Sequence, residues 1–268
     1  MDAAKSQADG TAARVALETV GLDAGYAGKA VQRDVNLRIA AGEIFVLLGG
    51  SGCGKSTVMR TLAGLLPPIR GKVSYFGETF AEAGTEREES PALLRRIGVM
   101  FQNGALFGSK TLLENCAVPF ESQPGRTEKE IRAIGMEKLE WVGLADFAGH
   151  YPSQISGGMQ KRAAIARALV LEPDVLFLDE PSAGLDPVTS AGLDELILGI
   201  RERKGMTVVM VSHELASIYA IADRAAFFDR ATHSVLDEGT PTGLRDGSRH
   251  AAVRAFFNRT TEQEEGRA

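Results

Sequence analysis

The sequence predicts an α/β fold in which a parallel sheet carries helices on both faces. The first observation is that short apolar runs alternate with segments of helical periodicity in the second half of the chain. Strands are expected at residues 175–178, 207–211 and 225–229, and helices at residues 191–201 and 215–221. The second observation is a glycine-rich loop between an apolar run at 44–48 and an apolar-periodic helix at 57–66. The third is the helical pattern of residues 103–159, which indicates a helical insertion into one core.

The glycine-rich loop matches the phosphate-binding pattern G-x-x-x-x-G-K-[ST] in its strand–loop–helix context. Glycines leave backbone N–H groups free to approach phosphate oxygens, and the following helix N-terminus adds partial positive charge. Lys55 supplies a full charge and Ser56 a hydroxyl ligand for Mg²⁺. We therefore expect a nucleoside triphosphate to be held by Gly49, Gly50, Ser51, Gly52, Cys53, Gly54, Lys55, Ser56 and Thr57.

Composition sets limits on the other functions. The chain has 268 residues, of which 44% are hydrophobic and 24% charged, and its net charge is −5. A broad nucleic-acid-binding face is disfavoured because no block of Lys and Arg is present. No apolar stretch reaches the roughly 20 residues that cross a bilayer, and residues 1–11 resemble no export signal. We expect a soluble cytoplasmic protein that reaches a membrane only through a partner.

The chain is expected to divide into four parts. Residues 1–12 are small and polar and are predicted to be disordered, and residues 13–240 form the core domain. A helical subdomain is expected at about residues 103–162, and a short helical tail at residues 241–268. The charged stretch at residues 78–96 is interpreted as a surface excursion before a strand at residues 97–101.

Two carboxylates end the apolar run at residues 175–178. A buried parallel strand there would place Asp179 at its carboxyl end, where open α/β sheets bind ligands. Asp179 would then hold Mg²⁺, and Glu180 would polarise the water that attacks the γ-phosphate.

A second anion site is predicted where Ser156, Gly157 and Gly158 lead into a helix at residues 163–171. Ser156 is a natural N-cap, and the glycines expose backbone N–H groups at a positive helix end. Because one triphosphate needs only one phosphate loop, we interpret this site as facing the phosphate loop of a second subunit.

Taken in order, these motifs resemble those of ATP-binding cassette (ABC) ATPases over residues 14–240. The series comprises the phosphate loop, Gln102, Ser156 to Gly158, Asp179 with Glu180, residues 182–186, and His213. The resemblance implies an ABC-type core with an antiparallel β subdomain and an inserted α-helical subdomain. It also implies hydrolysis of ATP with Mg²⁺ by a homodimer of cassettes.

The resemblance assigns roles to single residues. It implies that Tyr26 stacks on adenine, that Gln102 senses Mg²⁺ and the attacking water, and that His213 holds the γ-phosphate and the water. Asp186 would lie at the dimer interface and contact nucleotide. Two positions depart from the family pattern, namely Gly50, where many relatives have Pro, and Met159, where most have Gln.

A finer resemblance is to cassettes of Mla/MCE-type phospholipid transporters. Gln102 to Phe107, the sequence Ser-Gly-Gly-Met ending at Met159, and the tail at residues 248–258 are similar to segments of those proteins. This implies phospholipid transport between inner and outer membranes, at the cytoplasmic face of the inner membrane. The implied partners are a permease that docks in a groove lined by Ala105, Leu106 and Phe107, and an MCE-domain protein reached through the permease.

Other functions remain open on the sequence. The chain is also compatible with another ABC importer or exporter, and less so with an ABC ATPase acting on DNA or ribosomes. A GTPase or small-molecule kinase would leave Ser156 to Met159 unexplained. Finally, Cys53 lies beside Lys55 at a helix N-terminus, which favours a reactive thiolate, whereas Cys116 has the apolar neighbours of a buried thiol.

Overall fold

A parallel sheet forms the centre of the protein, as the sequence predicts. The computed structural model describes residues 14–85, 91–122 and 125–260. Six strands run in the order β11-β10-β4-β9-β8-β7, and all neighbours pair in parallel except β10 with β11. The strands are β4 (Ile44–Gly49), β7 (Ile97–Met100), β8 (Val175–Asp179), β9 (Thr207–Val211), β10 (Arg224–Phe228) and β11 (Val235–Gly239).

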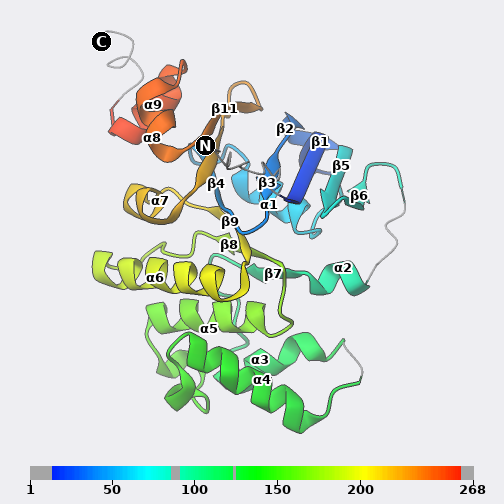
Figure 1. Ribbon diagram of the computed structural model, residues 1–268, viewed down its shortest axis with the longest axis vertical. Coiled ribbons are helices and arrows are strands. Elements are labelled where there is room, and N and C mark those ends of the chain that lie inside the picture. The colour runs from blue at the N-terminus through cyan, green and yellow to red at the C-terminus, as the bar shows by residue number, and fades with distance from the viewer. Residues whose placement is uncertain (1–13, 86–90, 123–124, 261–268) are drawn as a thin grey trace, which may run out of the picture.

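An antiparallel sheet lies beside it, at the upper right of Figure 1. Its strands are β1 (Val15–Tyr26), β2 (Lys29–Val35), β3 (Arg38–Ala40), β5 (Arg70–Tyr75) and β6 (Glu78–Glu82). The interpretation of residues 78–96 as a surface excursion is wrong, because they contain β6 and the short helix α2 (Pro91–Arg95). Phe80 is buried in β6 and packs edge-on against Tyr75, with ring centroids 5.1 Å apart.

The parallel sheet separates two hydrophobic cores. All six residues of β4 are buried, and their side chains alternate between the two sides. Ile44, Val46 and Leu48 join the core on the side of the long helices. Phe45 and Leu47 join the core shared with the antiparallel sheet and α1 (Lys55–Leu62). Because both faces of the sheet are covered, its central strands β4, β8 and β9 are nearly continuous apolar runs.

Helices cover the first of these faces. They are α5 (Gly157–Leu169), α6 (Pro187–Lys204) and α7 (Leu215–Ile221), of which α6 is longer than the sequence predicts. Asp186 starts α6 by accepting hydrogen bonds from Val188 N and Thr189 N, which explains the earlier start. In the described residues no helix combines the length and apolar character that crossing a membrane requires.

The inserted helices lie at the end of the molecule opposite to the tail helices (Figure 1). The insertion contains α3 (Leu112–Ala117), α4 (Glu128–Trp141) and the short 3₁₀ turns η1 (Val118–Phe120), η2 (Ala145–Phe147) and η3 (Pro152–Gln154). Capping boxes begin α3 at Thr111 and α4 at Thr127.

The described part of the tail forms two helices, α8 (Pro241–Gly247) and α9 (Ala251–Asn258). Val253 and Phe257 are buried on one side of α9, and the Phe256 ring lies 5.5 Å from the ring of Phe227 in β10. The expected disordered segment at residues 1–12 and the last part of the tail, residues 261–268, lie outside the described residues.

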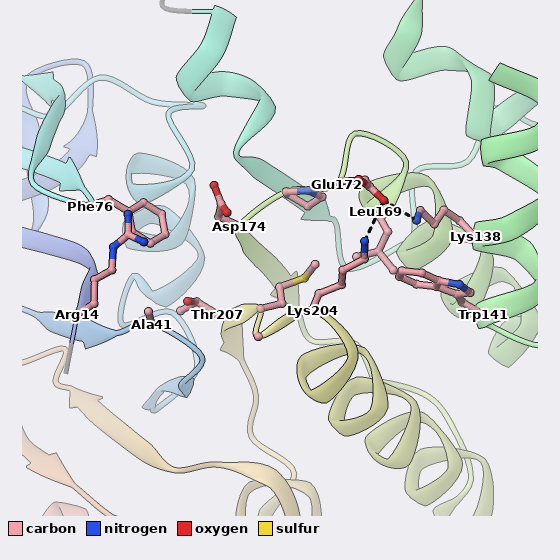
Figure 2. A pocket seen from close by; sticks show the side chains of 13 residues that line it. Arg14, Ala41, Phe76, Lys138, Trp141, Leu169, Glu172, Asp174, Lys204 and Thr207 are labelled. Carbon is pink, nitrogen blue, oxygen red and sulfur yellow. Dashed lines mark hydrogen bonds and ion pairs between the residues drawn. The ribbon is translucent and has the colours of Figure 1, made fainter. Parts of the chain in front are cut away.

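A cluster of ion pairs joins the inserted helices to the core. The side chain of Lys138 in α4 is 1% exposed, and its ammonium lies 3.1 Å from Glu172 and 3.7 Å from the Trp141 ring centroid. Figure 2 shows Glu172 between Lys138 and Lys204 of α6, which is also 3.1 Å away. Glu137 is a second partner of Lys138, at 3.0 Å. Glu172 therefore links three segments through one carboxylate.

We expect Glu172→Gln to lower stability at neutral pH by about 1 kcal/mol, or about 2–4 °C in Tm, because Glu172 stays half exposed to water. Hydrogen bonds from Lys204 and Lys138 lower the pKa of Glu172. Its contribution is therefore complete above the unfolded-state pKa of about 4.3 and is lost as pH falls through the lower folded-state value. Thermal melts between pH 7 and pH 3 check this.

The control is Glu121→Gln, which removes an exposed contact 3.5 Å from Lys110 and should leave Tm unchanged. Equal Tm values for the wild type and Glu172→Gln at pH 7 would contradict the assigned role of Glu172.

Candidate functional site

The strand order brings the predicted site residues to one edge of the parallel sheet. Strands β4, β9, β8 and β7 are consecutive neighbours, and the residues after their carboxyl ends are the phosphate loop, His213, Glu180 and Gln102. A pocket of about 710 Å³ opens there. Its lining residues are Val31, Gly49, Gly50, Ser51, Gly52, Gly54, Lys55, Ser56, Thr57, Gln102, Glu180, His213 and Phe256.

The phosphate loop has the open backbone that phosphate binding requires. A Cβ added at Gly50 or Gly52 would meet no atom within 4 Å, so the loop is open on this side. On its closed side Gly49 has φ +139°, and an added Cβ would lie 2.2 Å from Phe228 O. Lys55 is buried, and its Nζ donates to Gly49 O at 2.8 Å and Gly50 O at 2.9 Å. The loop and its cation therefore fit the phosphates of a nucleotide.

A buried amide that the sequence did not reveal supports this loop. Gln32 in β2 donates through Nε2 to Cys53 O at 2.6 Å and to Asp229 O at 2.8 Å. These two bonds connect the loop to the end of β10. A lone Gln in a predicted strand carries no sequence signal for such a role.

Ser56 and Asp179 meet beside the loop. The Ser56 hydroxyl donates to Asp179 Oδ1 at 3.1 Å, and burial raises the pKa of Asp179. Within the described residues no group of three or more His, Cys, Asp or Glu side chains is arranged to hold a metal. A hydroxyl and one carboxylate instead suit Mg²⁺, which takes its other ligands from phosphates and water.

Glu180 lies between two polar side chains, as the predicted roles require. Gln102 Nε2 donates to Glu180 Oε2 at 3.1 Å, and His213 Nδ1 lies 3.4 Å from Oε1. Glu180 has φ +48°, a left-handed conformation that is rare outside glycine and concentrated at functional sites. The three residues come from the ends of β7, β8 and β9, so the sheet brings them together.

Tyr26 ends β1 at the border of the site. Its ring is 45% exposed, and its hydroxyl accepts a hydrogen bond from Arg60 Nη1 at 3.1 Å. A hydrogen bond with Thr57, which lines the pocket, is the main cause that lowers the pKa of Tyr26. Tyr26 is not among the residues that line the pocket, so its role in stacking on adenine stays a prediction.

The second predicted anion site lies elsewhere in this chain. Ser156 caps α5 by accepting from Met159 N at 3.3 Å, and an added Cβ at Gly158 would lie 2.7 Å from Thr189 Cγ2. The Met159 side chain is half buried against the core, and Asp186 caps α6. Among the described residues, none of Ser156, Gly157, Gly158, Met159 and Asp186 lines the pocket.

The expectation of a reactive Cys53 is wrong. Its side chain is 1% exposed, and its Sγ would lie 2.9 Å from a Cβ added at Gly49, so it packs under the loop rather than facing the pocket. Cys53 therefore contributes its backbone to the phosphate loop and not its thiol. Cys116 is buried as expected, and burial raises its pKa to about 12.

The expected groove for a partner also needs correction. A groove of about 390 Å³ is lined by Ala105 and Phe107, together with Phe101 and residues of β7, η1 and α5. Leu106, predicted to line it, instead packs half buried against the main core. Ala105 has φ +48°, and after it Leu106 is half buried whereas Phe107 is 48% exposed.

A separate cavity of about 260 Å³ lies at the opposite edge of the sheet, beside the Glu172 ion pairs (Figure 2). It is lined by Asp174, which precedes β8, and by Thr207, which begins β9. Ligands of parallel sheets bind at the carboxyl ends of strands. The phosphate-loop pocket is therefore the candidate site.

A phosphate loop joined to an Asp–Glu pair at a parallel sheet edge defines a P-loop nucleoside triphosphatase. The family model described as ABC transporter matches residues 32–183. The probable ribonucleotide transport ATP-binding protein mkl of Mycobacterium leprae is 42% identical over 91% of this chain and 69% of its own length. The methionine import ATP-binding protein MetN of Caulobacter vibrioides is 40% identical over 76% of this chain and 60% of its own length.

Solved structures agree with this match. The ATP-binding cassette MJ0796, in a dimeric post-hydrolysis state bound to ADP and Pi, has a TM-score of 0.74 at 30% identity and covers 84% of this chain and 98% of its own. The cassette cbiO1 of Clostridium perfringens has a TM-score of 0.77 at 25% identity, and the match covers 94% of this chain and 98% of its own. The chain belongs to the ABC transporter family and is an ATP-hydrolysing cassette of that family.

We expect both thiols of the native protein to resist maleimide, reacting at least about tenfold slower than in guanidinium, because a buried thiol is not available for attack. Mass spectrometry after brief labelling measures this. Rapid labelling of Cys53 in the native protein, with loss of hydrolysis, would show that the loop opens in solution.

Proposed function

We propose that this protein is the ATP-hydrolysing subunit of a membrane transporter and works as a homodimer. The observation that carries the proposal is Glu180, whose carboxylate is held by Gln102 and His213 beside the phosphate loop and the Ser56–Asp179 pair. The proposal thus assigns to one pocket a base, the two side chains that contact it and a pair of residues that suits Mg²⁺.

In hydrolysis a water oxygen forms a bond to the γ-phosphorus, and the bond from that phosphorus to the bridging oxygen breaks to release ADP. Glu180 accepts a hydrogen bond from the water and orients it, while Gln102 and His213 keep the carboxylate in place. Lys55 pairs with the phosphate charge, and Tyr26 offers a ring to the adenine. Mg²⁺, held by Ser56 and Asp179, would neutralise charge on the phosphates.

The dimer follows from the position of the second anion site. Ser156 and Gly157 are exposed at the N-terminus of α5, outside the pocket of their own chain. Backbone N–H groups at a helix N-terminus attract phosphate, so this end suits the nucleotide of a second copy. In the proposed dimer, Ser156 to Met159 and Asp186 of each subunit complete the site of the other. The dimer of the related cassette MJ0796 supports this arrangement.

The experiment that tests this function is a pair of substitutions. Glu180→Gln should reduce hydrolysis about 100-fold or more and keep ATP binding, so that an ATP-bound dimer accumulates in size-exclusion chromatography. Lys55→Ala should instead lose nucleotide affinity, because the phosphate charge is left unpaired. Hydrolysis by Glu180→Gln near the wild-type rate would overturn the assignment.

For the cargo we propose phospholipid transport with a permease and an MCE-domain protein at the inner membrane. The support is the segment at residues 102–107 and Met159, which are similar to segments of Mla/MCE-type cassettes. The names of the relatives favour ribonucleotide transport as a second candidate, and methionine import as a third. Reconstitution with the permease that co-purifies, followed by transport assays with each cargo, separates the three.

The permease is proposed to contact the groove at Ala105 and Phe107. Phe107 is 48% exposed, and the other residues that line the groove are apolar except Arg167, which is typical of a surface that a partner covers. Phe107→Glu should abolish co-purification with the permease and leave basal hydrolysis intact, since the pocket is untouched.

Leu65→Glu is the matched control, because Leu65 is also 48% exposed but lies in the bend that follows α1, outside the groove. It should co-purify as the wild type does. Full co-purification of Phe107→Glu would place the docking surface elsewhere.

A further inference from the structure

Lys161 lies in α5, about one and a half turns after Ser156. Its ammonium makes a close hydrogen bond to Gln102 O and a longer one, at 3.4 Å, to Glu180 O. Both acceptors are main-chain carbonyls, and they belong to the two residues whose side chains meet through Gln102 Nε2 and Glu180 Oε2. One cation therefore joins the backbones of both residues.

The backbone of Glu180 needs such support. A non-glycine residue with φ +48° costs roughly 1–2 kcal/mol, so its neighbours must hold it there. Its N–H donates to Val211 O at 2.9 Å, and its C=O accepts from Ala183 N at 3.2 Å as well as from Lys161. The position of the Glu180 carboxylate depends on the conformation of the Glu180 backbone. A hydrogen bond to the Glu180 carbonyl therefore affects how this carboxylate is oriented toward the water.

Helix α5 holds the Gln102 loop at a second point. Arg167 is buried and donates through Nη1 to Ala105 O at 2.6 Å and through Nη2 to Gly104 O at 2.7 Å. Lys161 and Arg167 thus fix the start and the middle of the same loop to one helix. Movement of α5 would move this loop and the Glu180 backbone together.

Charge pairing alone does not account for Lys161. The carboxylates of Glu180 and Asp179 are close enough to raise the pKa of Lys161, against a larger lowering by burial. Yet the hydrogen bonds of its ammonium go to carbonyl oxygens rather than to those carboxylates. An ammonium with several donors suits two carbonyls from different segments.

We propose that Lys161 is a positioning residue for hydrolysis, which orients Glu180 and Gln102 through their main-chain carbonyls and attaches both to α5. The inference rests on the proposed function, because it takes Glu180 as the group that orients the water. Helix α5 would then support the hydrolytic residues of its own chain, in addition to presenting the exposed anion site at its N-terminus to a second copy.

The test is Lys161→Met, which keeps the length of the apolar stem and removes the donors. Displacement of a catalytic group by a fraction of an ångström lowers turnover, so kcat should fall about 10- to 100-fold. The Kd for a fluorescent ATP analogue and the Tm should stay at wild-type values. Lys161→Arg, which keeps a cationic donor, should recover part of kcat. The control is Lys129→Met, an exposed lysine in α4, which should change nothing.

A second arm separates positioning from contact with the nucleotide of a partner. In the Glu180→Gln background, Lys161→Met should leave the ATP concentration for dimer formation unchanged. The proposal is overturned if Lys161→Met keeps the wild-type kcat, or if its affinity for the ATP analogue or its Tm falls along with kcat. It is also overturned if Lys161→Arg recovers no kcat, or if the double variant forms the dimer less readily than Glu180→Gln does. Failure of the proposed function is distinct, because Glu180→Gln itself would then hydrolyse ATP.

Discussion

Burial of β4 on both faces is the constraint on which the site depends. Its apolar side chains contribute about 1.5–3 kcal/mol each when fully buried, and they alternate between two cores. A shift of one residue would exchange the two faces, so the register is strongly fixed. The phosphate loop therefore starts at a fixed point, where the nearness of Phe228 O leaves no room for a side chain at Gly49. The parallel neighbours of β4 then bring His213, Glu180 and Gln102 to the same edge.

Helix α5 is exposed at its start and buried in its middle. Ser156 and Gly157 at its start are exposed, whereas Ala164 and Ile165 in its middle are fully buried in the main core. A helix packed in this way moves as a unit with the elements around it. Contact at its exposed end would therefore be transmitted to whatever the helix holds, which includes the Gln102 loop.

The sequence predicted the phosphate loop, Gln102, Glu180 and His213 as site residues, because each follows an apolar run that reads as a strand. It predicted less well where tertiary packing decides. β6 was missed since five residues with a single buried aromatic give little periodicity. Leu106 and Cys53 were assigned to surfaces, but Leu106 packs half buried against the main core and Cys53 is buried, because tertiary packing rather than residue type decides their exposure. Gln32 and Lys161 act through backbone carbonyls, which leave no pattern in a sequence.

The loop at residues 102–107 joins chemistry to partner binding through its own rigidity. Gln102 at one end meets Glu180, and Phe107 at the other end lines the apolar groove. Arg167 holds the middle, and the buried amide of Asn115 holds Phe107 by accepting from its N–H at 2.8 Å and donating to its C=O at 3.1 Å. Because Arg167 and Lys161 attach the middle and the start of this segment to α5, a displacement of Phe107 by a partner would reach Gln102 through α5. It would then also act on the carboxylate that orients the water.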